Sequence, residues 1–297
     1  MRGFTLRSMA LAGLLLAPVL VQAQLLPTLM LPGQRPPTCT RAELQTAADG
    51  YVAWQSGGSV PVPGAAAAAS ASEKPSGWTP AWGVMTYVEN FDLMQARNGL
   101  VNELLKVDRH LSLVDTAQCE TYTEGLVSDK AHPYAFGARL RVRGQAVLEM
   151  EMMWSAPGDR GFDIDGYLKG SANEDWSTIP ADRRDTRAKL ESVANDYLDA
   201  LLAGKAEIMP WGLPCPGAAA NGGCEVGLPA GTVNVANRHY VVDETIGAVA
   251  VLSTIGSDPS TGRVRAADAH LFRVENGKVR FVHAVTHESD AAKSPQK

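Results

Sequence analysis

The sequence lacks the short motifs that identify many enzymes. It has no Gly-x-Ser-x-Gly turn, no His-Glu-x-x-His helix, no phosphate-binding loop and no dinucleotide-binding glycine fingerprint. No serine or cysteine stands in a setting that would activate it as a nucleophile. These absences argue against α/β-hydrolases, zinc proteases and nucleotide-binding enzymes.

Clustered basic charge and long hydrophobic runs are also absent. The net charge is −5, or −7 once Arg2 and Arg7 are removed, which argues against nucleic acid and anionic membranes as partners. The apolar run 8–21 is too short for a committed membrane span. It follows a basic start and precedes a small-residue site at Ala23, so we predict a signal peptide over 1–23, cleaved before Gln24, and a secreted or periplasmic protein. Residues 24–38, rich in proline and leucine, are predicted to form a loose N-terminal arm.

Cysteine is scarce but even in number: Cys39, Cys119, Cys215 and Cys224. In an exported chain four cysteines indicate two disulfides, with three pairings open. Cys215 and Cys224 lie close together in a Gly/Ala/Pro-rich segment, which favours their pairing and leaves Cys39 for Cys119. Zinc is the alternative, but a C-x8-C spacing without a nearby histidine fits it poorly.

An internal repeat is the most informative feature that is present. Residues 41–58 align with 187–204 without a gap, and 6 of the 18 positions are identical. Further along, Arg141-Val142 aligns with Arg273-Val274. We therefore predict two repeats, 39–180 and 181–288, with a low-complexity flexible insertion at 59–77 and a disordered tail at 289–297.

The same order of elements is predicted in both repeats, a helix followed by strands, which is an α+β pattern. Thr40 and Glu43 form a capping box, and the stripe from Leu190 to Leu201 indicates a helix that ends at Gly204. Two-residue alternation predicts strands in both repeats, whereas 82–107 is predicted to be helical. The predicted strands are 109–115, 119–128, 134–143 and 146–155, then 238–244, 247–256 and the two strands around Asn276-Gly277.

The last hairpin yields the main candidate site. A two-residue turn at Asn276-Gly277 pairs Phe272 with Phe281 and puts His270 directly opposite His283, on an apolar face. Two such histidines suit acid–base chemistry. The alternative is structural: two buried histidines bonded to partners such as Asp268 or Asp243. No metal is expected, because His283 and His287 are about 13 Å apart along a strand.

Other polar residues are weaker candidates. In the hairpin around Gly144-Gln145, Glu149 and Glu151 are predicted to share a face with Leu140; an inward carboxylate could act as acid or base, and a solvated one would pair with arginine. On strand 238–244, Arg238 or Tyr240 could stabilise negative charge, whereas Asp243 is more typical of a turn cap. The remaining polar or aromatic candidates for pocket lining are Tyr51, Tyr197, Tyr87, Asn90, Tyr134 and Trp211. For Tyr51 and Tyr197 a core position with a satisfied hydroxyl is the default.

The order of elements resembles the cone-shaped SnoaL-like fold, which is related to nuclear transport factor 2. Across 39–287 the chain is more closely similar to a family of secreted fungal and bacterial proteins of uncharacterised function. The segments that carry this resemblance include Tyr87-Val88-Glu89-Asn90, Pro210-Trp211-Gly212, Asn237–Glu244 and His270–Val274. The insertion at 59–77 departs from the family pattern.

The resemblance implies two cone domains, each with a pocket between a curved antiparallel sheet and its helices. It implies acid–base chemistry without a cofactor, by a lyase, including an aldehyde-releasing carbon–carbon lyase, or an isomerase, on a small apolar or aromatic molecule. The predicted hairpin makes His283 and His270 the acid–base pair for such chemistry, with Trp211, Phe272 and Phe281 among the lining residues. A small-molecule binding protein without turnover and a structural or interaction module are the alternatives, and homodimerisation is left open.

Overall fold

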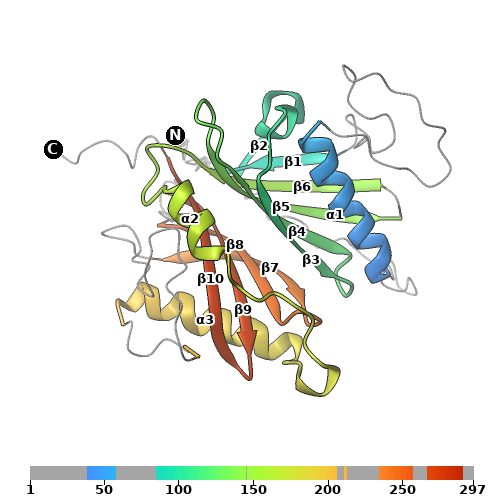
Figure 1. Ribbon diagram of the computed structural model, residues 1–297, viewed down its shortest axis with the longest axis vertical. Coiled ribbons are helices and arrows are strands. Elements are labelled where there is room, and N and C mark those ends of the chain that lie inside the picture. Colours follow the sequence, from blue (N-terminus) through green and yellow to red (C-terminus); the bar gives the residue numbers. More distant parts are fainter. Residues whose placement is uncertain are drawn as a thin grey trace, which may run out of the picture. The chain divides into compact units, whose positions relative to one another are not determined.

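Each half of the sequence builds one sheet. The computed structural model of the chain describes residues 39–57, 85–144, 146–205, 211–212, 234–256 and 266–289. The first sheet has the strand order β2-β1-β6-β5-β4-β3, and only the pairing of β1 with β6 is parallel (Figure 1). Its strands are β1 (Thr86–Glu89), β2 (Asp92–Met94), β3 (Arg109–Asp115), β4 (Glu120–Val127), β5 (Tyr134–Arg143) and β6 (Ala146–Ser155).

The second sheet is an antiparallel meander with the order β10-β9-β8-β7. Asn276 and Gly277 both have positive φ, as the predicted two-residue turn between the last two strands requires. The predicted strands of both repeats are therefore confirmed, as is the α+β class. The strands of this sheet are β7 (Val235–Asp243), β8 (Ala248–Ile255), β9 (Ala266–Glu275) and β10 (Lys278–Glu288).

Three α-helices accompany the sheets among the described residues: α1 (Arg41–Gln55), α2 (Ile164–Ser171) and α3 (Arg187–Ala203). The predicted capping box of Thr40 and Glu43 starts α1. Helix α3 is capped by Thr186 at its N-terminus and by Gly204, which adopts the left-handed conformation, at its C-terminus. All six residues of the predicted apolar stripe of α3 are buried. Local sequence signals therefore fixed both long helices.

The helical prediction for 82–107 is wrong. Its described residues contain β1, β2 and two short 3-10 helices, Ala96–Asn98 and Leu100–Asn102. Strand β1 lies beside β6, which comes some 60 residues later in the chain and supplies its hydrogen-bonding partner. Pairing with a distant strand outweighs a weak local preference.

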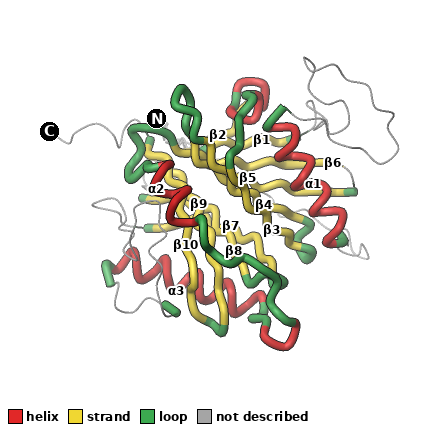
Figure 2. The backbone as a smooth tube through the Cα atoms, viewed as in Figure 1, coloured by secondary structure: helices red, strands yellow, loops and turns green. Residues whose placement is uncertain are grey.

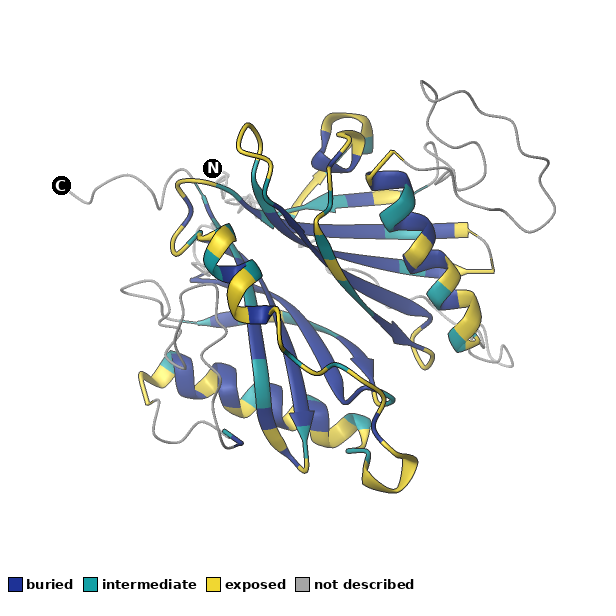
Figure 3. Cartoon of the chain, viewed as in Figure 1, coloured by how far each residue is buried: buried dark blue, intermediate teal, exposed yellow. Residues whose placement is uncertain are grey.

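Two helix–sheet layers pack against each other through their sheets, with the long helices α1 and α3 on the outer faces (Figure 2) and exposed residues on their outer surfaces (Figure 3). Helix α2 instead lies at the edge between the sheets, where Tyr167 packs with Leu126 and Val285. Helix α1 buries Leu44, Tyr51 and Trp54 against the first sheet, and α3 buries its stripe against the second. A third core joins the sheets, with Leu113, Tyr122 and Met153 facing residues such as Leu252 and Leu271. All described residues belong to one compact unit, Pro37–Lys297.

Both hairpins that end the repeats contain a β-bulge at the same place. In the first sheet Val142 pairs with Val147 and Arg141 with Glu149, so Leu148 is the extra residue. In the second sheet Val274 pairs with Val279 and Arg273 with Phe281, so Arg280 is extra. A bulge moves every later side chain of its strand to the other face. The faces predicted for β6 and β10 are therefore wrong beyond the bulges.

The two halves also exchange matching contacts. Arg41, at the start of α1, binds Asp243 at the end of β7 in the second half, and Arg187, at the start of α3, binds Asp115 at the end of β3 in the first. Asp243 also accepts from the backbone N–H of Val114, and Asp115 from that of Val242. Such reciprocal contacts are typical of an isologous interface, formed here within one chain.

The predicted Cys39–Cys119 disulfide is present and links the start of α1 to the turn before β4. The predictions of a signal peptide over 1–23, an N-terminal arm, an insertion at 59–77, a disordered tail and a Cys215–Cys224 disulfide all concern residues outside those that the structure describes.

Candidate functional site

The predicted pairing of His270 with His283 is wrong. His283 pairs with Leu271, and His270 pairs with Ala284, because the bulge at Arg280 shifts the register by one residue. His270 therefore faces α3, and His283 faces the first sheet. The two imidazoles lie on opposite sides of the second sheet and cannot act as one acid–base pair.

His270 instead forms a dyad with its neighbour on the same face of β9. Its Nδ1 lies 2.5 Å from Oδ2 of Asp268, and both side chains are buried. Oδ1 of Asp268 accepts a hydrogen bond of 2.6 Å from the Thr286 hydroxyl, and the Ser253 hydroxyl lies 3.5 Å from Oδ2. Residues two apart in a strand point to the same side, which is why the pattern Asp-Ala-His places carboxylate and imidazole together.

Aromatic side chains surround this dyad. The ring of Phe272 stacks on that of His270, with centroids 5.7 Å apart and an interplanar angle of 13°. The ring of Tyr197, on α3, lies 6.0 Å from that of His270, and Trp211 packs edge-on against Tyr197 at 5.5 Å. Asp268, His270, Tyr197, Trp211 and Phe272 are called the dyad site below.

Two polar atoms of the dyad site have no hydrogen-bond partner. Within the described part of the chain, Nε2 of His270 and the hydroxyl of Tyr197 are both buried and unpaired. An unpaired buried polar atom costs about 1–3 kcal/mol, and such atoms in a native structure call for an explanation. A bound molecule that pairs with both would remove the cost.

The tautomer of the neutral His270 ring and the protonation of Tyr197 follow from their surroundings. Because the Asp268 carboxylate accepts from Nδ1, the neutral imidazole carries its proton there and leaves Nε2 as a hydrogen-bond acceptor. Burial raises the pKa of Tyr197, and the negative charge of Asp268 raises it further. The Tyr197 hydroxyl therefore remains protonated at neutral pH. The site combines an oriented base with a hydrogen-bond donor, as general acid–base catalysis requires.

His283 has a different setting, between the two sheets. Its Nδ1 lies 2.8 Å from Glu124 on β4, its Nε2 lies 2.7 Å from Glu174, and the Tyr167 hydroxyl donates to Glu124. Burial alone would lower the pKa of His283, but the charges and hydrogen bonds of Glu124 and Glu174 outweigh it and raise the pKa to about 9. Both ring nitrogens are occupied, so His283 serves as a buried ionic link between the halves.

Glu151 also belongs to a closed ionic cluster. The buried guanidinium of Arg139 bonds Glu120 at 2.9 Å and Glu151 at 3.0 Å, and it also bonds Glu149. The prediction that Glu149 and Glu151 share a face with Leu140 is wrong: beyond the bulge they join Arg139 on the side that faces the second sheet. His239, on β7, completes the cluster through Glu120.

The candidates on β7 are engaged elsewhere. Arg238 bonds Asp199 and Asn195 on α3, and the Tyr240 hydroxyl donates to the same Asn195 at 2.8 Å. Tyr240 faces α3 in one row with Val251 and His270, two strands from the dyad. Asp243 accepts a hydrogen bond from the backbone N–H of Thr245, as a turn cap does. It also forms the ion pair with Arg41 that links the two halves.

The predicted lining residues divide between different regions. Trp211 and Phe272 lie in the dyad site, whereas Phe281 packs against Trp176 on the other face of the sheet. In the first half, the Tyr87 hydroxyl donates to Glu89, and the side chain of Asn90 accepts from the backbone of Trp154. Tyr134 packs edge-on against Trp154. The structure therefore assembles only part of the predicted set around His270.

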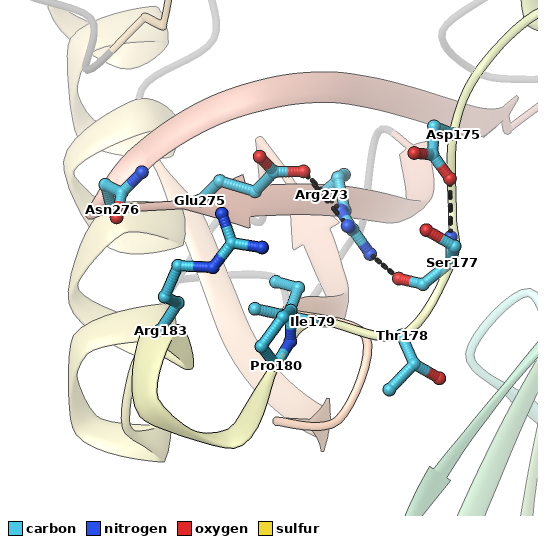
Figure 4. Close-up of a pocket in the computed structure, with 9 residues that line it drawn as sticks. All are labelled: Asp175, Ser177, Thr178, Ile179, Pro180, Arg183, Arg273, Glu275 and Asn276. Atoms are coloured by element: carbon cyan, nitrogen blue, oxygen red, sulfur yellow. Dashed lines mark hydrogen bonds and ion pairs between the residues drawn. The ribbon is translucent and has the colours of Figure 1, made fainter.

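A small surface pocket lies apart from the dyad site, between the segment 175–183 and the turn after β9 (Figure 4). Its volume is about 150 Å³. The guanidinium of Arg273 is held there by Glu275 and by the carbonyl oxygens of Ser177 and Ile246. Four of the five guanidinium N–H groups of Arg273 therefore already have an acceptor.

Sequence reasoning missed Thr286 and Ser253 as members of this polar group, and it named Tyr197 only as a possible lining residue. Tyr197 was expected to be a core residue with a satisfied hydroxyl; it is in the core, but its hydroxyl is unpaired. The two-residue spacing of Asp268 and His270 was a usable signal, because it holds whatever the register of the neighbouring strand.

In comparisons with known proteins, a protein-family match covers the second half of the chain. A family described as a domain of unknown function, DUF8021, matches residues 183–286. The match covers 104 of the 297 residues and contains α3, His270 and His283, but neither α1 nor the first sheet. No curated protein and no solved structure matches the chain.

Two further findings concern metal sites and membrane-spanning helices. Among the described residues, no cluster of three or more histidine, cysteine, aspartate or glutamate side chains has the geometry to hold a metal ion. No described helix has both the length and the apolar character needed to cross a membrane.

Proposed function

We propose that this chain is a cofactor-independent acid–base enzyme of the lyase or isomerase type, and that its second half carries the active site. The observation that supports this most directly is the pair of buried, unpaired polar atoms at Nε2 of His270 and the hydroxyl of Tyr197. The base is oriented by a carboxylate, and the donor is held beside it in an apolar core. The substrate is a small, mostly apolar molecule.

The chemistry of the dyad site follows from its hydrogen-bonding groups. Nε2 of His270 removes a proton from a carbon next to a carbonyl group, and the negative charge of Asp268 stabilises the imidazolium that forms. The Tyr197 hydroxyl donates to the carbonyl oxygen, where negative charge develops. The imidazolium then returns the proton to another carbon in an isomerisation, or to a leaving group in a lyase reaction.

The proposal extends to the fold and location. Each half is proposed to be a SnoaL-like cone, since each has a long helix packed on one face of its sheet. The chain is proposed to be exported; the Cys39–Cys119 disulfide supports this, because disulfides persist in oxidising compartments.

Proton abstraction can be tested without the natural substrate. The purified protein is incubated in D₂O with cyclohexanone, acetophenone or 2-tetralone, and deuterium incorporation beside the carbonyl is followed by proton NMR. We expect exchange above the buffer rate for the ketone that fits the site. The variant His270→Gln should slow it by about 10²-fold or more, the usual contribution of a general base.

The control is His132→Gln, because His132 is exposed and lies far along the chain from the dyad. It should exchange at the wild-type rate. Equal rates for wild-type protein, His270→Gln and buffer would remove the enzymatic proposal. If an unmodified small molecule co-purifies with the protein while no exchange occurs, the function is ligand binding instead.

A further inference from the structure

The two unpaired atoms of the dyad site have opposite hydrogen-bonding characters. Nε2 of His270 accepts, because Asp268 holds the imidazole proton on Nδ1. The hydroxyl of Tyr197 can donate, and it has no acceptor among the described residues. A single group that satisfies both must donate to the first and accept from the second. A hydroxyl group does both with one oxygen atom.

The charges around the site favour a neutral ligand. Asp268 already places a buried negative charge beside His270. Arg238, the cation on β7 that reaches toward α3, is engaged by Asp199 and Asn195. A carboxylate or phosphate would therefore add a second buried negative charge without a described partner, which is strongly unfavourable.

The side chains packed around the dyad suit a planar apolar ligand. Phe272 stacks on the imidazole, and Trp211 and Tyr197 meet edge to face. Such aromatic groups, with few polar atoms among them, are typical of sites for flat apolar ligands. Val251 and Val282 add aliphatic surface on the same face of the sheet.

We propose that the dyad site selects a neutral ring-bound hydroxyl group, a phenol or an enol, whose O–H donates to Nε2 of His270 and whose oxygen accepts from the Tyr197 hydroxyl. This inference uses the site of the proposed function and specifies its ligand class. It does not require turnover. A trapped water molecule could pair with the same two atoms, so the test must separate a phenol from water.

The experiment compares three non-reactive probes of similar size: phenol, anisole and benzoate. Each is titrated into the full mature chain labelled with ¹⁵N-histidine, and the ring nitrogens of His270 are followed by NMR. Phenol should shift Nε2 and bind about tenfold more tightly than anisole, which cannot donate, and than benzoate, which is charged.

Matched tyrosine variants locate the second contact. Tyr197→Phe should weaken phenol binding several-fold and leave anisole unchanged, because only the hydroxyl is removed. Tyr122→Phe is the control, since Tyr122 also has a buried hydroxyl without a partner among the described residues but faces the core between the sheets. It should bind all three probes like the wild type.

The inference is overturned if phenol and anisole bind equally, if benzoate binds best, or if no probe shifts His270, the result expected for a site filled by water. Selective phenol binding without any ketone exchange would keep this inference and remove the proposed catalysis. Ketone exchange that depends on His270 without a preference for phenol would do the reverse.

Discussion

The two helix–sheet cores have the same framework and different polar contents. In the second half, Asp268, His270 and Phe272 line the face of β9 that packs against α3. The positions 132 residues earlier hold Phe136, Ala138 and Leu140, which line the face of β5 against α1. The first core is therefore filled by apolar side chains where the second has its dyad. Packing can be kept in both copies while only one of them carries the groups of the proposed chemistry.

The ties that hold each helix to its sheet differ as well. In the first half, Cys39 precedes α1 and is bonded to Cys119. At the matching place before α3 stands Asp185, whose carboxylate accepts a hydrogen bond of 2.9 Å from the backbone N–H of Gly277. A covalent link in one half corresponds to a hydrogen bond in the other. Removing the covalent link should therefore lower the free energy of unfolding more than removing the hydrogen bond.

The largest expected effect is a loss of activity when the dyad of the second half is changed. Asp268→Asn would retain a hydrogen-bonding side chain but no negative charge to orient and stabilise the imidazolium. We expect ketone exchange to fall by about 10²-fold, whereas a similar change near the other core, Asp49→Asn on the exposed side of α1, leaves it unchanged. Equal losses in both variants would show that the dyad has no special role.

The next effect concerns the covalent link. The double variant Cys39→Ser/Cys119→Ala opens a loop that spans a sequence separation of 80, so the free energy of unfolding should fall by about 2–4 kcal/mol. Urea unfolding measures it. Because the dyad site belongs to the other half, exchange activity under native conditions should persist; its loss would mean that the first half supports the site.

A pH effect of similar size concerns His283. Its folded pKa of about 9 lies above the unfolded value of about 6.5, so its contribution to stability is complete below pH 6.5 and is lost as the pH rises through 9. The loss amounts to about 3 kcal/mol by the usual conversion. Urea unfolding between pH 6 and 10 should show it in the wild type and not in His283→Gln. The same fall in His283→Gln would assign it to another group.

The smallest effect concerns the reciprocal ion pairs. Arg187→Met and Arg41→Met each leave a buried aspartate without its arginine, but these arginines are partly exposed, at 27% and 41%, so water weakens the interaction. We expect losses of about 1–2 kcal/mol, with Arg187→Met the more costly. The double variant tests whether the two ion pairs depend on each other. Additive losses of unfolding free energy mean independent contacts, and non-additive losses mean one coupled interface.

Much of the framework could be predicted because its signals are local. The cap at Thr40, the stripe of α3 and the alternation in the strands each depend on residues close together in the chain. The same holds for the dyad, since Asp268 and His270 share a face of one strand in any register. The Cys39–Cys119 bond was within reach because only four cysteines were available.

The errors came from features that depend on distant segments. The bulges at Leu148 and Arg280 leave no clear local signature, yet each reverses the faces of the residues that follow. The strand β1 was missed because its partner β6 is far along the chain. Glu124 and Glu174 bond the two ring nitrogens of His283, and both lie in distant segments of the chain.

By itself, the sequence determined the two long helices α1 and α3, most of the strands and the shared face of Asp268 and His270, because hydrogen bonding within a few residues and the two-residue period of a strand fix them. It did not show α2, which lies in a segment rich in turn-forming residues. The tertiary structure alone decided that His283 is an ionic link and that His270 faces Tyr197. The reason is that a one-residue change of register costs little locally, and only the packing of α3 and the first sheet against opposite faces of β9 and β10 selects one outcome.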